Sequence, residues 1–312
     1  MNINQLDAFL VLADCLSVTE TARRIHCTQP AVTMRIQMLE QELGTPLFDR
    51  VAKRLHLTRQ GKTFRQYALE VVNTLATARE HLRQMEDPLS GTIHFGASNF
   101  IGAYLIPALI AHHRKLAPKL AFELDIASSS ELVRRLEAGS VDFLMVSDQL
   151  QLDQARFVFH EWCRDRLVLI ASPEHAFARR KTVRLAEVST ETFLIKPGPS
   201  ATRDFLSERL RLSGVTLADE MHISSLEAIK QAVMHDLGVS IVSRFAVSRE
   251  IAAGDLVEIP LADAVFERGI RIIHHREKLL SPAVTRFLDL VMAQDMPGQS
   301  AASISGVDGP TL

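Results

Sequence analysis

Apolar residues in the first sixty positions recur at helical spacing in three separate stretches. The first stretch predicts a helix over about 4–14 with one buried stripe. The residues from Ser17 to Glu20 have the form of a capping box, so a second helix is predicted to begin there. Thr28 then offers a new N-cap, and Pro30 falls in the first turn of a third helix. The predicted buried stripe of the third helix is Val32, Ile36, Leu39 and Leu43.

The opposite face of the third helix is free to contact a partner. On a helical wheel it carries Pro30, Thr33, Met34, Gln37 and Gln41. Residues 47–58 follow as a strand-turn-strand pattern with a basic tip. A basic hairpin alone is usually a solvated turn, but here it completes the order of a winged helix-turn-helix. The residues predicted to bind DNA are Thr28, Gln29, Pro30, Thr33, Met34, Arg35, Gln37, Arg50, Lys53 and Arg54.

Four segments of this region resemble the signature of LysR-type transcriptional regulators. They read Ser-Val-Thr-Glu-Thr-Ala at 17–22, Thr-Gln-Pro-Ala-Val-Thr at 28–33, Leu-Glu-Gln-Glu-Leu-Gly at 39–44 and Pro-Leu-Phe-Asp-Arg at 46–50. The resemblance implies a regulator that binds double-stranded DNA, with RNA polymerase as a further candidate partner. Met34 departs from the family, which commonly has Arg at that position. Arg35 points to the flank, so base readout is expected to depend on Gln29, Thr33 and Met34, with less recognition of guanine.

A strict apolar period of 3.5 residues follows over 61–87. The positions in this seam are Phe64, Ala68, Val71, Leu75, Ala78, Leu82 and Met85. Such a seam predicts a long helix paired with a second copy, although it could also pack on its own chain. The resemblance favours pairing, because the family dimerises through its linker helix, and it implies a homodimer or homotetramer. Pro88, Ser90 and Gly91 are predicted to end the helix.

Strands and helices alternate through the rest of the chain, which indicates two parallel α/β lobes. Strands are predicted at 93–97, 120–126, 141–146, 167–171, 192–196, 239–243 and 270–274, and helices near 100–116, 130–138, 202–212, 226–235 and 282–292. By resemblance, the last strand and helix return to the first lobe in a periplasmic-binding-protein-like (type 2) effector domain. The expected organisation is a DNA-binding domain over 1–60, a linker helix over 61–87, an effector domain over 88–296 and a disordered tail over 297–312. Lobe one is expected to take about 88–162 and 268–296, and lobe two about 163–267.

Hydroxyl side chains follow several predicted strands, at the edge where open α/β sheets bind ligands. Each alone would most simply be a helix N-cap, but together they indicate a cleft. By resemblance, Ser98 in Gly-Ala-Ser at 96–98 matches a frequent ligand-contacting position, and 199–203 resembles Gly-Ser-Gly-Thr-Arg with both glycines replaced. Lys196 at the same edge could pair with a carboxylate, sulfate or phosphate, so an anionic metabolite is the favoured effector, although Lys196 alone would more simply be a surface lysine. The predicted effector site is Ser98, Asn99, Phe100, Ser128, Ser129, Ser147, Lys196, Ser200 and Thr202.

Composition changes this interpretation little. The net charge is −2, so the basic character needed for DNA must be local. The three cysteines show no metal spacing, and His112-His113 and His274-His275 are adjacent pairs whose members point to different faces, so neither a metal nor another cofactor is expected. With no predicted membrane span or signal peptide, the expected location is the cytoplasm.

Two other function classes fit the sequence less well. An enzyme would need a site such as a nucleophile elbow, but Gly-Ala-Ser-Asn-Phe at 96–100 lacks the final glycine. A solute-binding protein for transport would share the two lobes but would carry an export signal and no winged helix-turn-helix. The sequence therefore favours a non-enzymatic regulator in which an effector between the lobes acts allosterically on DNA binding.

Overall fold

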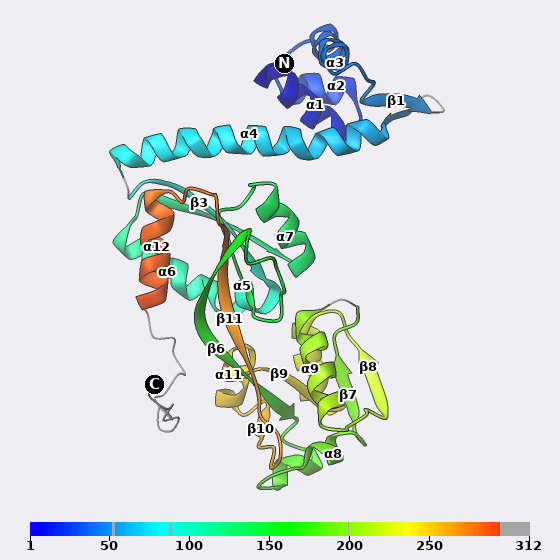
Figure 1. Ribbon diagram of the computed structural model, residues 1–312. Coiled ribbons are helices and arrows are strands. Elements are labelled where there is room, and N and C mark those ends of the chain that lie inside the picture. The colour runs from blue at the N-terminus through cyan, green and yellow to red at the C-terminus, as the bar shows by residue number, and fades with distance from the viewer. Residues whose placement is uncertain (52–53, 88, 199, 294–312) are drawn as a thin grey trace, which may run out of the picture.

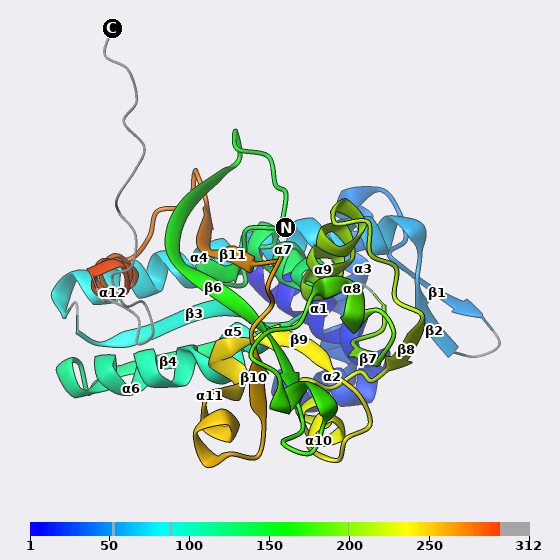
Figure 2. The same ribbon diagram turned by 90° about the horizontal axis from the view of Figure 1, so that it is seen from below.

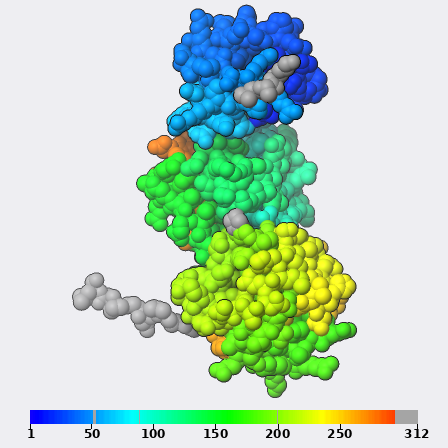
Figure 3. Space-filling view, turned by 90° about the vertical axis from the view of Figure 1, so that its right-hand side faces the viewer, coloured from blue at the N-terminus to red at the C-terminus, as the bar shows by residue number. Residues whose placement is uncertain are grey.

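The computed structural model describes residues 1–51, 54–87, 89–198 and 200–293. Lys53 and the tail at 297–312, for which the sequence made predictions, lie outside the described residues. An N-terminal unit, a long helix and two lobes follow one another through the molecule (Figure 1). The space-filling view shows the N-terminal unit, lobe one and lobe two stacked in that order (Figure 3). None of the described helices is both long and apolar enough to cross a membrane.

The N-terminal unit is a small helical core with a hairpin beside it. Its elements are α1 (Ile3–Cys15), α2 (Val18–Arg24), α3 (Gln29–Leu43), β1 (Phe48–Val51) and β2 (Arg54–Leu57). Phe9 is fully buried at the centre, with its ring edge-on to those of Phe48 and Phe64 at centroid distances of 5.5 and 5.1 Å. Aromatic rings prefer such edge contacts, which fix how the hairpin sits on the helices. The predicted winged helix-turn-helix order is confirmed.

Two local predictions in this unit are wrong. Ser17 accepts a hydrogen bond from the Glu20 amide at 3.3 Å, but the Glu20 carboxylate binds Arg23 and Arg24 instead of returning to Ser17, so the capping box is half formed. These charge-assisted bonds are stronger than a bond to a neutral amide, and they lower the pKa of Glu20 to about 2. Leu43, expected to be buried, is 37% exposed because it is the last residue of α3.

The long helix α4 (Arg59–Glu86) begins against the hairpin. Thr58 caps it by accepting from the Gly61 amide at 2.9 Å. A Cβ at Gly61 would lie 2.1 Å from the carbonyl oxygen of Leu47, so only glycine permits this approach. The start of α4 is therefore fixed to the N-terminal unit by close backbone packing.

The predicted dimer seam on α4 is divided between two environments. Ala68 is 1% exposed within the core of its own chain, so its assignment to a dimer seam is wrong, whereas Phe64 is half-buried and packs on Phe9 of the same chain. The reason is that the first turns of α4 complete the N-terminal core. Further along, Leu75 is half-buried, whereas the remaining seam positions are exposed: Val71, Ala78, Leu82 and Met85.

Lobe one is a sheet covered by helices. Its parallel strands are β3 (Gly91–Ser98), β4 (Leu120–Ala127) and β5 (Phe143–Ser147), and its helices are α5 (Asn99–Tyr104), α6 (Ile106–Leu116), α7 (Ser129–Glu137) and α12 (Pro282–Ala293). Phe287 of α12 packs on Phe95 and Phe143 of the sheet. The single helix expected over 100–116 is wrong, because Pro107 has no N–H to donate back and the helix breaks at Leu105.

Lobe two repeats the α/β pattern with shorter strands. It contains η1 (Ala176–Arg179), α8 (Leu185–Val188), β7 (Thr192–Ile195), α9 (Ala201–Leu212), β8 (Asp219–His222), α10 (Leu226–Met234), β9 (Ser240–Ser243), α11 (Arg244–Ala253) and β10 (Val257–Ile259). β7 and β8 are parallel, whereas β9 and β10 pair antiparallel with a strand shared with lobe one. The sequence did not predict β8, β10 or α11. All four residues of β8 are exposed, so this strand has no buried positions to create an alternating pattern.

Two long antiparallel strands connect the lobes (Figure 2). They are β6 (Phe157–Ala171) and β11 (Phe266–His275). β11 pairs with β5 in lobe one, and β6 pairs with β9 and β10 in lobe two. The strands predicted at 167–171 and 270–274 are too short, because the charged residues where the strands cross between lobes interrupt the apolar pattern. These strands position both walls of the cleft.

Candidate functional site

The face of α3 predicted to bind DNA lies at the outer end of the molecule, away from both lobes (Figure 1). Its exposed members are Thr28, Gln29, Pro30, Thr33, Met34 and Gln37, and Arg35 is half-buried at the flank. Met34 is 58% exposed, and Met38 on the next turn is 50% exposed. The sequence analysis did not single out Met38. Two thioether side chains thus stand on or beside this otherwise polar face.

The hairpin adds positive charge next to α3. Arg50 and Arg54 are exposed on β1 and β2, and Lys53 between them is outside the described residues. Basic side chains on a protruding hairpin suit contacts with phosphates, which position a protein on DNA. Helix α3 can thus contact base edges while the hairpin contacts the phosphate backbone of the DNA.

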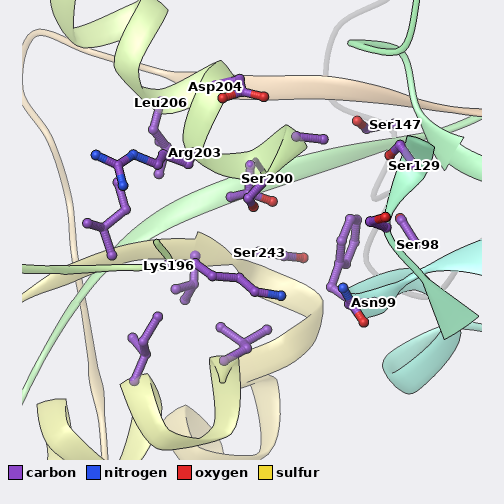
Figure 4. A pocket seen from close by; sticks show the side chains of 18 of the residues that line it. Ser98, Asn99, Ser129, Ser147, Lys196, Ser200, Arg203, Asp204, Leu206 and Ser243 are labelled. Atoms are coloured by element: carbon purple, nitrogen blue, oxygen red, sulfur yellow. The ribbon is translucent and has the colours of Figure 1, made fainter. Parts of the chain in front are cut away.

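A cavity of about 850 Å³ lies between the two lobes. It is bounded by the carboxyl ends of β3, β4, β5 and β7 and by the starts of α5, α7, α9 and α10. Figure 4 shows side chains of both lobes lining it. All the residues predicted for the effector site line this one cavity: Ser98, Asn99, Phe100, Ser128, Ser129, Ser147, Lys196, Ser200 and Thr202.

The hydroxyl groups of the cavity are not equivalent. Ser128 caps α7, accepting from the Glu131 amide at 3.4 Å, as an ordinary N-cap does. Ser98 and Ser200 begin helices without such a bond. Among the buried side-chain atoms that the structure describes, the Oγ atoms of Ser98 and Ser147 have no hydrogen-bond partner. Buried hydroxyls are rarely left unpaired, so these two are available to a ligand.

Arg268 lies where the lobes meet. It is 2% exposed, and on β11 it stands directly opposite Asp165 of β6. Its Nε and Nη2 donate to Asp165 Oδ2 at 2.9 and 2.8 Å, and its Nη1 donates to Thr202 Oγ1 at 2.8 Å. The guanidinium also lies 4.4 Å from the ring centroid of Phe100. One side chain therefore contacts lobe one through Phe100 and lobe two through Thr202.

Burial opposes the charges of this pair. It raises the pKa of Asp165, and the charge of Arg268 and a hydrogen bond from Ser243 at 2.6 Å act against that rise. Burial likewise lowers the pKa of Arg268, and Asp165 counters it. It also raises the pKa of the nearby Cys163 thiol to about 12, so this cysteine is not a ready nucleophile. Each charge of the Arg268–Asp165 pair therefore offsets the effect of burial on the pKa of the other.

Another cationic group ties the lobes together at the rim of the cavity. Lys230 of α10 is 2% exposed and binds Glu227 at 2.9 Å and Glu250 at 2.5 Å. Desolvation acts to lower the pKa of Lys230, but these carboxylates outweigh it and raise the pKa. Tyr104 of lobe one donates to Glu227 at 3.2 Å, and its ring centroid is 5.2 Å from the Lys230 ammonium. The rim is thus a polar contact between α5 and α10.

Both parts of the chain match known protein families. Residues 3–62 match the bacterial regulatory helix-turn-helix proteins of the lysR family, and residues 86–295 match the LysR substrate binding domain. The chain belongs to the LysR family of bacterial transcriptional regulators. This LysR-family regulator is therefore a DNA-binding transcription factor with an effector-binding domain, and not an enzyme.

Similar proteins extend over nearly the whole regulator. An uncharacterised HTH-type transcriptional regulator of Bacillus subtilis, YwqM, is 31% identical over 93% of this chain and 98% of its own. The RuBisCO operon transcriptional regulator of Allochromatium vinosum is 28% identical over 94% and 96% of the two chains. The similarity therefore includes both domains and the helix between them.

Solved structures share the fold. Full-length OxyR from Pseudomonas aeruginosa has a TM-score of 0.71 at 23% identity, covering 94% of this chain and 93% of its own. CbnR in complex with its target DNA has a TM-score of 0.70 at 21% identity, covering 93% and 99%. The regulatory domain of CcmR from Synechocystis PCC6803, in complex with 2-PG, has a TM-score of 0.60 at 22% identity, covering 65% and 97%. The two-lobed architecture is thus that of known LysR regulators.

The sequence analysis missed Arg268, Asp165 and the Lys230 contact. A buried arginine is rare, and Arg268 stands beside Glu267 in a segment that was not assigned to a strand. Its partner is about a hundred positions away in the chain, so local spacing gives no signal. The pair could have been predicted if one strand carried a single acidic residue, and the other a single basic residue, among apolar positions.

We expect Asp165→Asn to lower the free energy of unfolding by roughly 3–5 kcal/mol, because it leaves the Arg268 charge buried without compensation. The matched control is Glu208→Gln, which breaks the exposed pair with Arg211 and should leave stability nearly unchanged, because solvent screens exposed ion pairs. Urea unfolding of the full-length regulator compares the two. Equal losses in both variants would show that the buried pair contributes no more than a surface pair.

Proposed function

We propose that a small anionic molecule bound between the lobes controls how this regulator holds DNA. The observation that carries the proposal is the pair of buried hydroxyls, Ser98 and Ser147, that line the cavity without a partner. The charge of Lys196 supports an anion, since none of the described side chains forms an ion pair with it. Helix N-termini at Ser128 and Ser225 also open onto the cavity and favour negative charge.

The proposed division of labour follows the expected domains. Residues 1–60 bind DNA, 61–87 pair two chains, and 88–296 bind the effector. The effector contacts both lobes, so its affinity depends on their relative arrangement, and by linkage it favours one arrangement over another. Pairing through α4 would carry that difference to two DNA-binding units on one partly palindromic site.

The effector site can be tested by thermal unfolding of the full-length regulator. The panel comprises inorganic phosphate, sulfate, 2-PG and small carboxylates, chosen because 2-PG occupies the related CcmR domain. At about a hundred times Kd, a true ligand stabilises by roughly 2.7 kcal/mol and raises Tm by a few degrees. We expect Ser98→Ala to abolish that rise, because it removes one of the unpartnered hydroxyls.

The control for Ser98→Ala is Ser189→Ala, at an exposed hydroxyl of lobe two that bonds only locally. It should leave the ligand-induced rise unchanged. A rise that persists in Ser98→Ala would place the ligand outside the cavity, and a panel without any rise would contradict an anionic effector.

Base readout by α3 is predicted to favour thymine over guanine, because Met34 offers methyl contact where the family commonly has a bidentate arginine. Selection from a random DNA library should return thymine at the base that Met34 meets. Met34→Arg should shift this position to guanine by about tenfold or more, as expected for one bidentate contact. Arg35→Ala is the control and should not change base preference; guanine contacts in the native protein that depend on Thr33 would refute the prediction.

The exposed stripe on α4 is predicted to form the dimer contact. Leu82 is 67% exposed there, and Leu82→Glu would place charges against the partner helix. We expect this variant to run as a monomer in size-exclusion chromatography with light scattering. Leu212→Glu alters a leucine that is 63% exposed on α9 and should leave the oligomer intact. If both variants keep the native mass, pairing occurs elsewhere.

A further inference from the structure

Arg268 lines the effector cavity, yet its charge is already used by Asp165. Two of its nitrogen atoms donate to the Asp165 carboxylate, which Ser243 also holds from the other side at 2.6 Å. A third nitrogen, Nη1, donates to the hydroxyl of Thr202 at 2.8 Å. Arg268 is therefore arranged as a fixed donor to Thr202 more than as a free cation.

The contact with Arg268 determines in which direction the Thr202 hydroxyl can form hydrogen bonds. A guanidinium can only donate, so the Thr202 oxygen must accept from it. The hydroxyl hydrogen then has to point elsewhere, and among the described residues Thr202 donates no hydrogen bond of its own. Thr202 lines the cavity in the first turn of α9, where the helix leaves it open to a ligand. Its hydroxyl is thus oriented as a donor toward the cavity.

We infer that Arg268 is a positioning residue that makes Thr202 a hydrogen-bond donor and so selects an effector with an acceptor oxygen, such as a carboxylate or phosphate, at that point. The inference rests on the proposed function and goes further by naming the group that reads the anion in lobe two. A hydroxyl polarised by a guanidinium donates more strongly than an isolated one, because linked hydrogen bonds reinforce each other. In this role Arg268 acts through Thr202.

Three substitutions separate this role from a structural one. Thr202→Val keeps the shape but removes the hydroxyl, and Thr202→Ser restores it. Arg268→Lys keeps a cation for Asp165, but a single ammonium lacks the fork needed to serve Asp165 and Thr202 together. The control is Arg211→Lys, in the exposed pair with Glu208.

The measurement is isothermal titration of the full-length regulator with inorganic phosphate and with 2-PG. We expect Thr202→Val and Arg268→Lys each to weaken binding by roughly ten- to a hundredfold, as for the loss of one hydrogen bond to a charged group. Thr202→Ser and Arg211→Lys should retain native affinity. In the double variant the losses should not add, because both changes remove the same donor.

The remaining outcomes of the titration show which of the two proposals is wrong. Additive losses would mean that Arg268 binds the anion itself, which overturns the positioning role. Native affinity in Thr202→Val, with binding still lost in Ser98→Ala, would overturn this inference and leave the proposed function intact. If neither these two anions nor any other member of the panel binds the native protein, both proposals fail. Urea unfolding of Arg268→Lys reveals any loss of folding, and in that case the comparison of Thr202→Val with Thr202→Ser decides.

Discussion

The buried pair of Arg268 and Asp165 fixes the geometry on which the cavity depends. The two residues face each other across β11 and β6, the strands that pass from one lobe to the other. A buried charge is tolerated only beside its partner, and a slip of one residue would turn either side chain to the opposite face. The pair thus holds the strands in register at the crossing point. That register in turn places Thr202 and Phe100 on either side of one guanidinium.

Helix α4, which connects the DNA-binding unit to the lobes, is hydrogen-bonded to lobe one. Helix α4 is bound to lobe one at three points: Glu80 accepts from the Thr92 amide at 3.0 Å, Gln84 from the Ala283 amide at 3.3 Å, and Asn73 donates to the Ala138 carbonyl at 2.8 Å. Lobe two meets the rest of the molecule through the crossing strands and the contacts at the cavity. In the proposed mechanism a ligand would therefore move lobe two relative to lobe one and α4.

The sequence was informative wherever a residue's role depended on its neighbours in the chain. The hydroxyls after strands were placed correctly at the cavity, because the carboxyl ends of parallel strands meet at one edge whatever the rest of the fold does. The seam on α4 shows the limit of this reasoning, since a period of 3.5 shows which residues share a face and not what covers it. Ala68 is covered by its own domain and Leu82 is not. Arg268 could not be found at all, because its function comes from Asp165 and Thr202, which only the folded chain brings close.

The charges around the cavity differ in how far they are neutralised, and this favours one end for an anion. Arg268 is balanced by Asp165, and Lys230 by Glu227 and Glu250. The starts of α7, α9 and α10 also carry an acidic residue each. At α7 this residue, Glu131, is held by two arginines. At α9, Asp204 has no cationic partner among the described side chains and opposes a nearby anion.

Two features therefore still favour an anion: the charge of Lys196 in lobe two, which has no carboxylate partner among the described side chains, and the start of α7 in lobe one, which lines the same cavity as the unpartnered hydroxyls. Close to Asp204 an acceptor oxygen can still be held, but by a directed hydrogen bond more than by charge. Thr202, oriented by Arg268, supplies such a donor. An effector that fits both lobes would thus place negative charge beside the hydroxyls of lobe one and an acceptor oxygen toward Thr202 of lobe two, and such a molecule would bring the two lobes together on it.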